Sequence, residues 1–146
     1  MIKFAKVRDV KSPNRGTLES AGLDFFVPKD FNPRLLVPGE DVMIPSGIKV
    51  KIEPGKALIA FNKSGVATKK HLQIGACVVD SDYQGEVHLH LTNIGIDTSL
   101  VKPGDKIAQF ILMDVGIDIP EEVEEKDLYS YETERGTGMC GSTGEK

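Results

Sequence analysis

The sequence contains no tryptophan, few aromatic residues and only two cysteines among its 146 residues. With aromatic residues at 6% of the chain, the core must be built mainly from aliphatic side chains. Cys77 and Cys140 stand far apart, without Cys-x-x-Cys or histidine spacing, so neither a zinc site nor a disulfide framework is predicted. No hydrophobic run approaches the length of a membrane-spanning helix, and no membrane association is expected.

The chain also lacks an excess of basic residues. Its formal net charge is −4 at pH 7, which leaves no basic stripe for nonspecific nucleic-acid binding. A few cations gathered in one place still suffice to bind a single phosphorylated small molecule. Residues 1–5 have no apolar core of signal-peptide length, so we expect a cytoplasmic protein, in the host cytoplasm if its source is a phage or virus.

Glycine and proline punctuate short runs of strand-like composition. Pro-Gly pairs occur at 38–39, 54–55 and 103–104. Residues 86–91 alternate strictly between polar and apolar, which predicts one buried and one solvated face. Only residues 63–72 have modest helical character. We predict an all-β fold, a jelly-roll-like β-barrel, with strands at 43–44, 48–52, 57–61, 85–92 and 107–115.

One domain is predicted over residues 1–146, with a barrel core at 1–115 and a C-terminal arm at 116–146. The arm is acidic at 120–126 and contains the segment RGTGMCGSTG at 135–144. Glycines leave backbone N–H groups free to meet an anion, Ser142 and Thr143 add donors, and Arg135 adds a forked cation. This composition predicts an arm that closes over phosphate and packs on a neighbouring subunit; a solvated terminus is the alternative.

Two carboxylates, Asp80 and Asp82, lie in the segment VVDSDYQG at 78–85. The segment is predicted to turn between an apolar run and the alternating strand, where its carboxylates meet solvent and ligand. Asp80 directly follows the apolar run and is the candidate catalytic residue, because a carboxylate there can orient and deprotonate a water molecule. Asp82 is expected to shape the turn, and local hydrogen bonding alone is the alternative for both.

Two further clusters of small and charged residues occur at strand edges, AGLD at 21–24 and NKSGVA at 62–67. Lys63 and Ser64 offer a cation and a hydroxyl group to phosphate oxygens, and Gly65 permits close approach of the backbone. Neither a Gly-x-Ser-x-Gly elbow nor a Walker A loop is present, which argues against a nucleophilic serine and a P-loop. Gln109, in an otherwise apolar strand, is either a phosphate donor or an outward-facing residue.

Taken in order, these segments resemble the five motifs of the trimeric dUTP pyrophosphatase (dUTPase) family. The resemblance extends over nearly the whole chain. The matching segments are AGLD at 21–24, KSGVA at 63–67, VVDSDYQG at 78–85, GDKIAQ at 104–109 and residues 135–144. Each segment alone is a weak signal, whereas five in the right order are a strong one.

The resemblance implies a homotrimer of jelly-roll-like barrels whose active sites are shared between subunits and closed by the C-terminal arm. It also implies hydrolysis of dUTP to dUMP and pyrophosphate, which lowers dUTP and supplies dUMP for thymidylate synthesis. Mg²⁺ is the implied cofactor, held through substrate phosphates and water rather than by direct protein ligands. The sequence has no dense carboxylate cage, which agrees with this arrangement.

The family's residue roles carry over onto the matching positions. Asp80 activates the attacking water, Tyr83 packs under the deoxyribose, and Asp24 and Asp82 support the site. Main-chain groups of residues 74–79 read uracil, and His88 either lines that pocket or faces solvent. The implied substrate-binding residues are Lys63, Ser64, Gly65, Ile74, Cys77, Val78, Val79, Tyr83, His88, Gln109, Arg135, Cys140, Gly141 and Ser142.

Several positions depart from the family pattern. Lys63 and Lys106 stand where the family usually has arginine, which replaces a forked cation by a point charge. Cys77 replaces a glycine of the uracil hairpin, and Met139-Cys140 replaces a Gly-Phe pair whose ring stacks on the base. We expect catalysis to survive. The changes in the base pocket are either neutral variation, or they retune the pocket to another deoxypyrimidine triphosphate or to one modified at the 5-position.

Two other functions stay open from the sequence alone. A dCTP deaminase shares this fold family, but it needs a proton-shuttling glutamate beside the base. A regulatory barrel would keep the nucleotide site and act through a protein partner, with the arm as a docking peptide.

Overall fold

The computed structural model describes residues 2–138, and the chain divides into two compact units, Met1–Gly116 and Ile117–Lys146. Within the described residues, the first unit holds the strands and the second holds a single-turn helix, α2 (Glu125–Leu128). The predicted binding residues Cys140, Gly141 and Ser142 lie outside the described residues.

The first unit is built almost entirely from β-strands, which confirms the predicted all-β class. Its one helix is α1 (Ser64–Lys70), within the segment predicted to have modest helical character. The strands are β1 (Lys3–Lys6), β2 (Leu23–Phe26), β3 (Arg34–Leu36), β4 (Asp41–Pro45), β5 (Ile48–Lys51), β6 (Lys56–Asn62), β7 (Leu72–Ile74), β8 (Val78–Val79), β9 (His88–Asn93), β10 (Ser99–Val101) and β11 (Lys106–Asp114).

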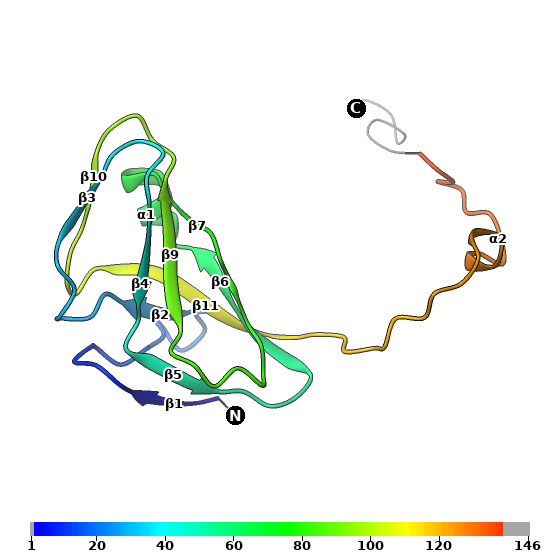
Figure 1. Cartoon of the computed structure of the whole chain (residues 1–146), viewed down its shortest axis with the longest axis horizontal. Helices are drawn as coiled ribbons and strands as arrows, with labels where there is room; N and C mark the ends of the chain where they lie inside the picture. Colours follow the sequence, from blue (N-terminus) through cyan, green and yellow to red (C-terminus); the bar gives the residue numbers. More distant parts are fainter. Residues whose placement is uncertain (1, 139–146) are drawn as a thin grey trace. The chain divides into compact units, whose positions relative to one another are not determined.

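The strands pair antiparallel in four sheets (Figure 1). The largest sheet has the order β2-β11-β6-β8, and the next has the order β4-β9-β7. Two-stranded sheets are formed by β1 with β5 and by β3 with β10. Many sheet neighbours are distant in sequence, so segments from several parts of the chain meet on the largest sheet.

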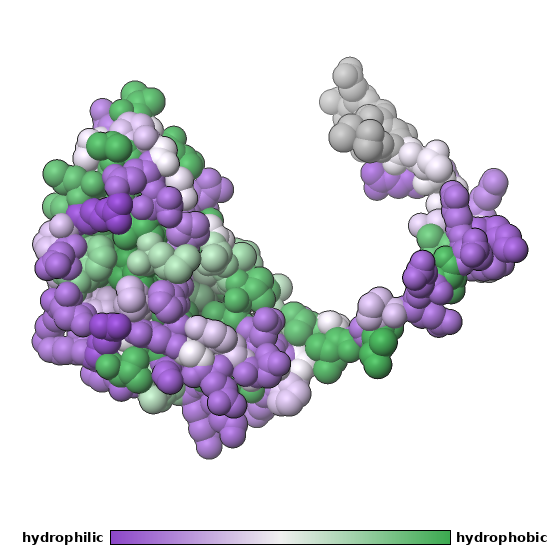
Figure 2. Space-filling model, in the orientation of Figure 1, coloured by the Kyte–Doolittle hydropathy of each residue, from purple (hydrophilic) through white to green (hydrophobic). Residues whose placement is uncertain are grey.

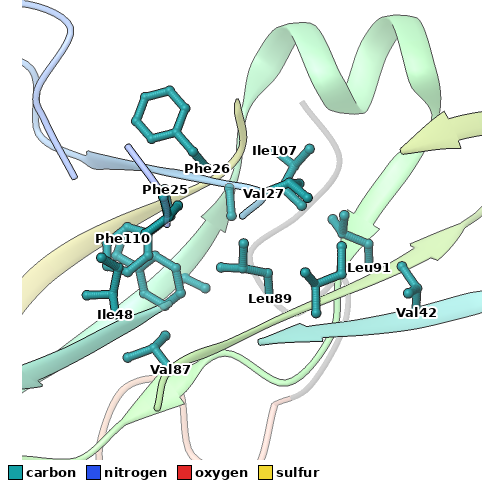
Figure 3. Packing of buried hydrophobic residues seen from close by; sticks show 14 of the residues in the cluster. Phe25, Phe26, Val27, Val42, Ile48, Val87, Leu89, Leu91, Ile107 and Phe110 are labelled. Atoms are coloured by element: carbon teal, nitrogen blue, oxygen red, sulfur yellow. The ribbon is translucent and has the colours of Figure 1, made fainter. Parts of the chain in front are cut away.

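The sheets enclose one hydrophobic core, in which aliphatic side chains predominate (Figure 3). Phe25 and Phe110, on adjacent strands β2 and β11, form a tilted ring pair with centroids 4.4 Å apart. Leu89 and Leu91 enter the core from β9, whereas His88 and His90 alternate with them on the outer face. The strict alternation therefore acts as predicted, with one face buried and one toward solvent.

The strand predicted at residues 85–92 begins later in the structure than expected. Residues 85–87 were expected to belong to it, but β9 begins at His88. The carboxylate of Glu86 accepts a hydrogen bond from the Gly47 N–H at 2.7 Å, and the Glu86 carbonyl accepts one from the Tyr83 hydroxyl at 2.9 Å. These bonds hold Glu86 before the strand begins, and Val87 pairs through its main chain with Ser46 and Ile48. The short strands β1, β2, β3, β7, β8 and β10 were not predicted, because few residues carry too little pattern.

Among the residues that the structure describes, no helix is long and apolar enough to span a membrane. Figure 2 shows hydrophobic residues on the surface of the first unit, including the end that carries β3 and β10. The large exposed apolar residues of this end are Leu35, Val37, Ile94, Ile96 and Leu100.

Candidate active site

Asp24 is the centre of a charged cluster on the largest sheet. Its side chain is only 5% exposed, and each carboxylate oxygen pairs with a lysine: Oδ1 with Lys63, and Oδ2 with Lys106 at 3.0 Å. Burial opposes ionisation of Asp24, but hydrogen bonds from the two lysines outweigh it and hold the pKa of the carboxyl below its usual range. The buried anion therefore orients both cations, which are partly exposed.

Gln109 joins three of the predicted motifs. It lies opposite Asp24 on β2 and opposite Phe61 on β6, and its Nε2 donates to the Asn62 carbonyl at 2.8 Å. Its side chain packs over Gly22, where an added Cβ would lie 2.6 Å from Oε1 of Gln109. The segments AGLD, KSGVA and GDKIAQ thus meet across β2, β11 and β6.

Ser64 and Gly65 form the first turn of α1. The Lys63 carbonyl accepts hydrogen bonds from the N–H groups of Val66 and Ala67, which fixes this turn directly after β6. Both Ser64 and Gly65 are exposed. A Cβ at Gly65 would meet no atom within 4 Å, so open space adjoins this backbone.

Residues 74–79 run from the end of β7, in the three-stranded sheet, through β8, in the four-stranded sheet. Asn62 Oδ1 accepts a hydrogen bond from the Ile74 N–H at 2.8 Å, and the Cys77 carbonyl accepts one from the Ala60 N–H at 2.8 Å. The Cys77 side chain is half-buried and packs against the hydrophobic core. Val79 is buried beside it, while Val78 is exposed.

Asp80 directly follows β8, and the predicted turn begins there. The Tyr83 N–H donates to the Asp80 carbonyl at 3.2 Å, and Asp80 itself is exposed. Beyond the turn, Arg8 Nε donates to Glu86 Oε1 at 2.8 Å. Burial raises the pKa of Glu86, but the hydrogen bonds from Arg8 and Gly47 outweigh it and hold this pKa below its usual range. The ionised Glu86 thereby anchors the end of the turn.

The outer side of this turn lines a surface cavity of about 460 Å³. Residues 81–84, which include Asp82 and Tyr83, form one wall, and residues 3–5 and 49–52 form the other, among them Phe4 and Lys51. The structure therefore places the predicted residues in two groups. Asp24, Lys63 and Gln109 belong to the first, while Asp80, Asp82 and Tyr83 belong to the second.

Several contacts in this region were not expected from the sequence. His88 was placed at the edge of the pocket or in solvent; it is exposed, and its Nδ1–H donates to the Glu86 carbonyl at 2.9 Å. His90, on the same face of β9, instead contacts the segment 74–79. The alternation in residues 86–91 indicated that the two histidines share a face, but nothing in it indicated their partners.

Arg135, in the second unit, donates from Nε to the Gly138 carbonyl at 3.1 Å.

Within residues 2–138, no group of three or more His, Cys, Asp or Glu side chains is arranged to hold a metal ion.

Comparison with protein-family models gives a match to the dUTPase model over residues 8–144. The chain is 34% identical to the deoxyuridine 5'-triphosphate nucleotidohydrolase of Mus musculus, over 98% of this chain and 85% of that protein. It is 36% identical to the protein of the same name from Desulfitobacterium hafniense, over 98% of this chain and 95% of that one.

Solved structures give the same fold. A dUTPase variant of Staphylococcus bacteriophage 80alpha with dUpNHpp superposes with a TM-score of 0.86 at 22% identity, covering 99% of this chain and 98% of that one. A dUTPase variant of phage phi11 of S. aureus, in which a structural Mg(II) ion is coordinated, gives a TM-score of 0.77 at 22% identity, covering 86% and 97%. These likenesses support the predicted architecture.

Proposed function

The chain belongs to the dUTPase family, and from this membership we propose how its residues act. The protein is a dUTP diphosphatase, which hydrolyses dUTP to dUMP and pyrophosphate. The structural observation that best supports the assignment of roles is the meeting of three motif segments around Asp24 and Gln109.

Asp80 is proposed as the general base. Its carboxylate takes a proton from a water molecule while the water oxygen forms a bond to the α-phosphorus. The bond from this phosphorus to the oxygen that bridges to the β-phosphorus breaks, and pyrophosphate leaves with the electron pair. The exposure of Asp80 at the end of β8 supports this role, because water and nucleotide can reach it.

The phosphates are assigned to the charged and small residues of the first group. Lys63, Ser64, Gly65 and Gln109 contact phosphate oxygens, and Asp24 keeps Lys63 oriented from behind. The open space beside Gly65 leaves room for a ligand at the backbone. In the tail, Arg135, Gly141 and Ser142 close over the γ end of the substrate.

The nucleoside is assigned to the segment 74–79 and the turn that follows it. Main-chain groups of Ile74, Cys77, Val78 and Val79 read uracil, with Cys140 near the base, and Tyr83 packs under the deoxyribose. Cytosine presents a donor where uracil presents an acceptor, and an unpaired polar group costs about 1–3 kcal/mol. The inward packing of the Cys77 side chain favours recognition by main-chain groups.

Mg²⁺ is proposed to be held by the three phosphates and water, because the described residues offer no cluster of ligands of their own. When bound, the ion neutralises phosphate charge. We further propose a homotrimer in which the arm completes the site of a neighbouring subunit, and a cytoplasmic location, where dUMP serves thymidylate synthesis. The exposed apolar side chains around β3 and β10 are compatible with assembly.

The direct test is pyrophosphate release with Mg²⁺ from dUTP, dCTP, dTTP, UTP and dUTP analogues substituted at the 5-position. Selective turnover of dUTP that is lost in Asp80→Asn, with nucleotide binding retained, is the expected result. Turnover centred on another nucleotide would indicate a retuned pocket, and ammonia release from dCTP would indicate a deaminase. Absence of turnover on every nucleotide would favour a binding protein that acts through a partner.

A further inference from the structure

His90, on β9, holds the segment 74–79 through two atoms. Its main-chain oxygen accepts a hydrogen bond from the Gly75 N–H at 3.1 Å, and its ring Nδ1 accepts one from the Ala76 N–H at 2.9 Å. The preceding N–H, of Ile74, donates to Asn62 Oδ1 at 2.8 Å. Of these three successive N–H groups, two are therefore held by one residue.

The other ring nitrogen fixes the orientation of the imidazole. His90 Nε2 lies 3.1 Å from Oδ2 of Asp41, on the neighbouring strand β4. Because the Ala76 N–H donates to Nδ1, that nitrogen carries no proton in the neutral ring, and the ring proton is on Nε2, where it donates to Asp41. The His90 side chain, 23% exposed, thus connects β4 to the segment 74–79.

Gly75 provides the space that the ring occupies. A Cβ at Gly75 would lie 2.1 Å from Nδ1 and 2.5 Å from Cε1 of His90. No larger residue fits at position 75 while the ring keeps this place, so the position of the backbone and the position of the ring determine each other.

From these contacts we propose that His90 is a positioning residue for pyrimidine recognition, an inference that rests on the function proposed above. It holds the main chain at residues 75–76, so that the groups that follow meet the base in one fixed geometry. Hydrogen bonds weaken steeply with distance and angle, so a displaced segment binds the base less well. Loss of the contact therefore raises KM and leaves the chemical step at Asp80 largely unchanged.

The contact to Ala76 requires a neutral imidazole. A proton on Nδ1 turns the acceptor into a second donor facing the Ala76 N–H, and the hydrogen bond is lost. The titratable groups on the surrounding elements are Asp41 on β4, His88 on β9 and Cys77 in the segment itself, whereas β7 contributes none. The protonated ring is therefore expected to support binding of dUTP less well than the neutral ring.

Three variants separate this role from a merely structural one. His90→Leu removes the ring acceptor, and His90→Asn keeps an acceptor oxygen near the place of Nδ1 without a titratable group. Met43→Ala is the matched control, because Met43 lies directly opposite His90 on β4 and is 55% exposed. For each, kcat and KM for dUTP are measured between pH 5.5 and 8.5, together with the ratio of kcat/KM for dUTP to that for dCTP.

We expect His90→Leu to raise KM for dUTP about three- to ten-fold at pH 7.5, as for one lost hydrogen bond, with kcat changed less than about two-fold. The KM and kcat values of His90→Asn and Met43→Ala for dUTP are expected to stay close to those of the unmodified protein. KM of the unmodified protein is expected to rise more than that of His90→Asn as the pH is lowered from 8.5 to 5.5. Equal KM values in all variants, or a fall in kcat without a change in KM for His90→Leu, would overturn the proposal.

A second measurement is independent of turnover. Nitrogen-15 NMR of the nucleotide-free protein reports the histidine tautomer, and the Ala76 amide signal reports its hydrogen bond. Neutral His90 with its proton on Nε2, and an Ala76 signal that shifts with its titration, are expected; a proton on Nδ1 would contradict the proposal. If dUTP is not hydrolysed, the proposed function fails, and dissociation constants for dUMP then replace KM in the comparison of variants.

Discussion

Nζ of Lys106 lies 3.0 Å from Oδ2 of Asp24, a carboxylate that is almost fully buried and that also pairs with Lys63. The two lysines, which stand where the family usually has arginine, therefore depend on one anion. The lysine ammonium group is a compact charge on a flexible side chain, so two lysines can approach the same carboxylate from different sides. The buried carboxylate in turn restricts the conformations of both side chains. Both lysines are thus accommodated at a single site.

Asp24→Asn is expected to reduce stability in a pH-dependent way. The pKa of Asp24 is lowered in the folded protein, so its contribution is fully present above the unfolded-state pKa of about 3.9 and is lost as pH falls through the folded-state value. We expect a loss of about 1–3 kcal/mol in the free energy of unfolding at pH 7. Urea unfolding of both proteins at pH 7 and pH 3 tests this; an equal difference at the two pH values would contradict it.

Gly22→Ala is expected to displace Gln109. An added Cβ would lie 2.6 Å from Oε1 and 3.0 Å from Cβ of Gln109, and the backbone around it is buried. We expect KM for dUTP to rise and the free energy of unfolding to fall by about 1–3 kcal/mol. Gly16→Ala is the control, because a Cβ there approaches only Ser20 Oγ, at 3.5 Å. Similar kinetics for the two variants would exclude a role of Gln109 in binding.

Gly85→Ala is expected to weaken discrimination against UTP. A Cβ at this position would lie 2.3 Å from Oη of Tyr83, so the ring must move. Tyr83→Phe removes only the hydrogen bond to the Glu86 carbonyl and keeps the ring. The ratio of kcat/KM for dUTP to that for UTP should fall in Gly85→Ala and be largely kept in Tyr83→Phe; the reverse order would show that the hydroxyl, not the ring, discriminates.

Cys77→Gly restores the residue usual for the family, and we expect it to act on stability rather than specificity. The thiol packs against the core, so its removal should lower the free energy of unfolding by about 1–2 kcal/mol. The preference for dUTP over dTTP, which carries a 5-methyl group, should change less than about two-fold. A change of ten-fold or more would place the Cys77 side chain in the base pocket and support a retuned site.

Much of the fold could be predicted because its signals are local. Residues 86–91 alternate, so their buried and exposed faces follow from the period of a strand, and β11 is a long apolar run. The start of β9 could not be predicted, because Arg8, Gly47 and Tyr83 hold Glu86 from distant or turned parts of the chain. The shortest strands carry too few residues to show a period.

The sequence by itself determined the class of fold, the order of the motif segments and the chemical character of each, because these depend on residue types and their spacing. Only the tertiary structure decided which side chains meet. Asp24 with Lys63 and Lys106, Gln109 with Asn62, and His90 with Ala76 and Asp41 are contacts between residues brought together by strand pairing. The register of non-local strands is set by packing of the whole core, and no short stretch of sequence contains that information.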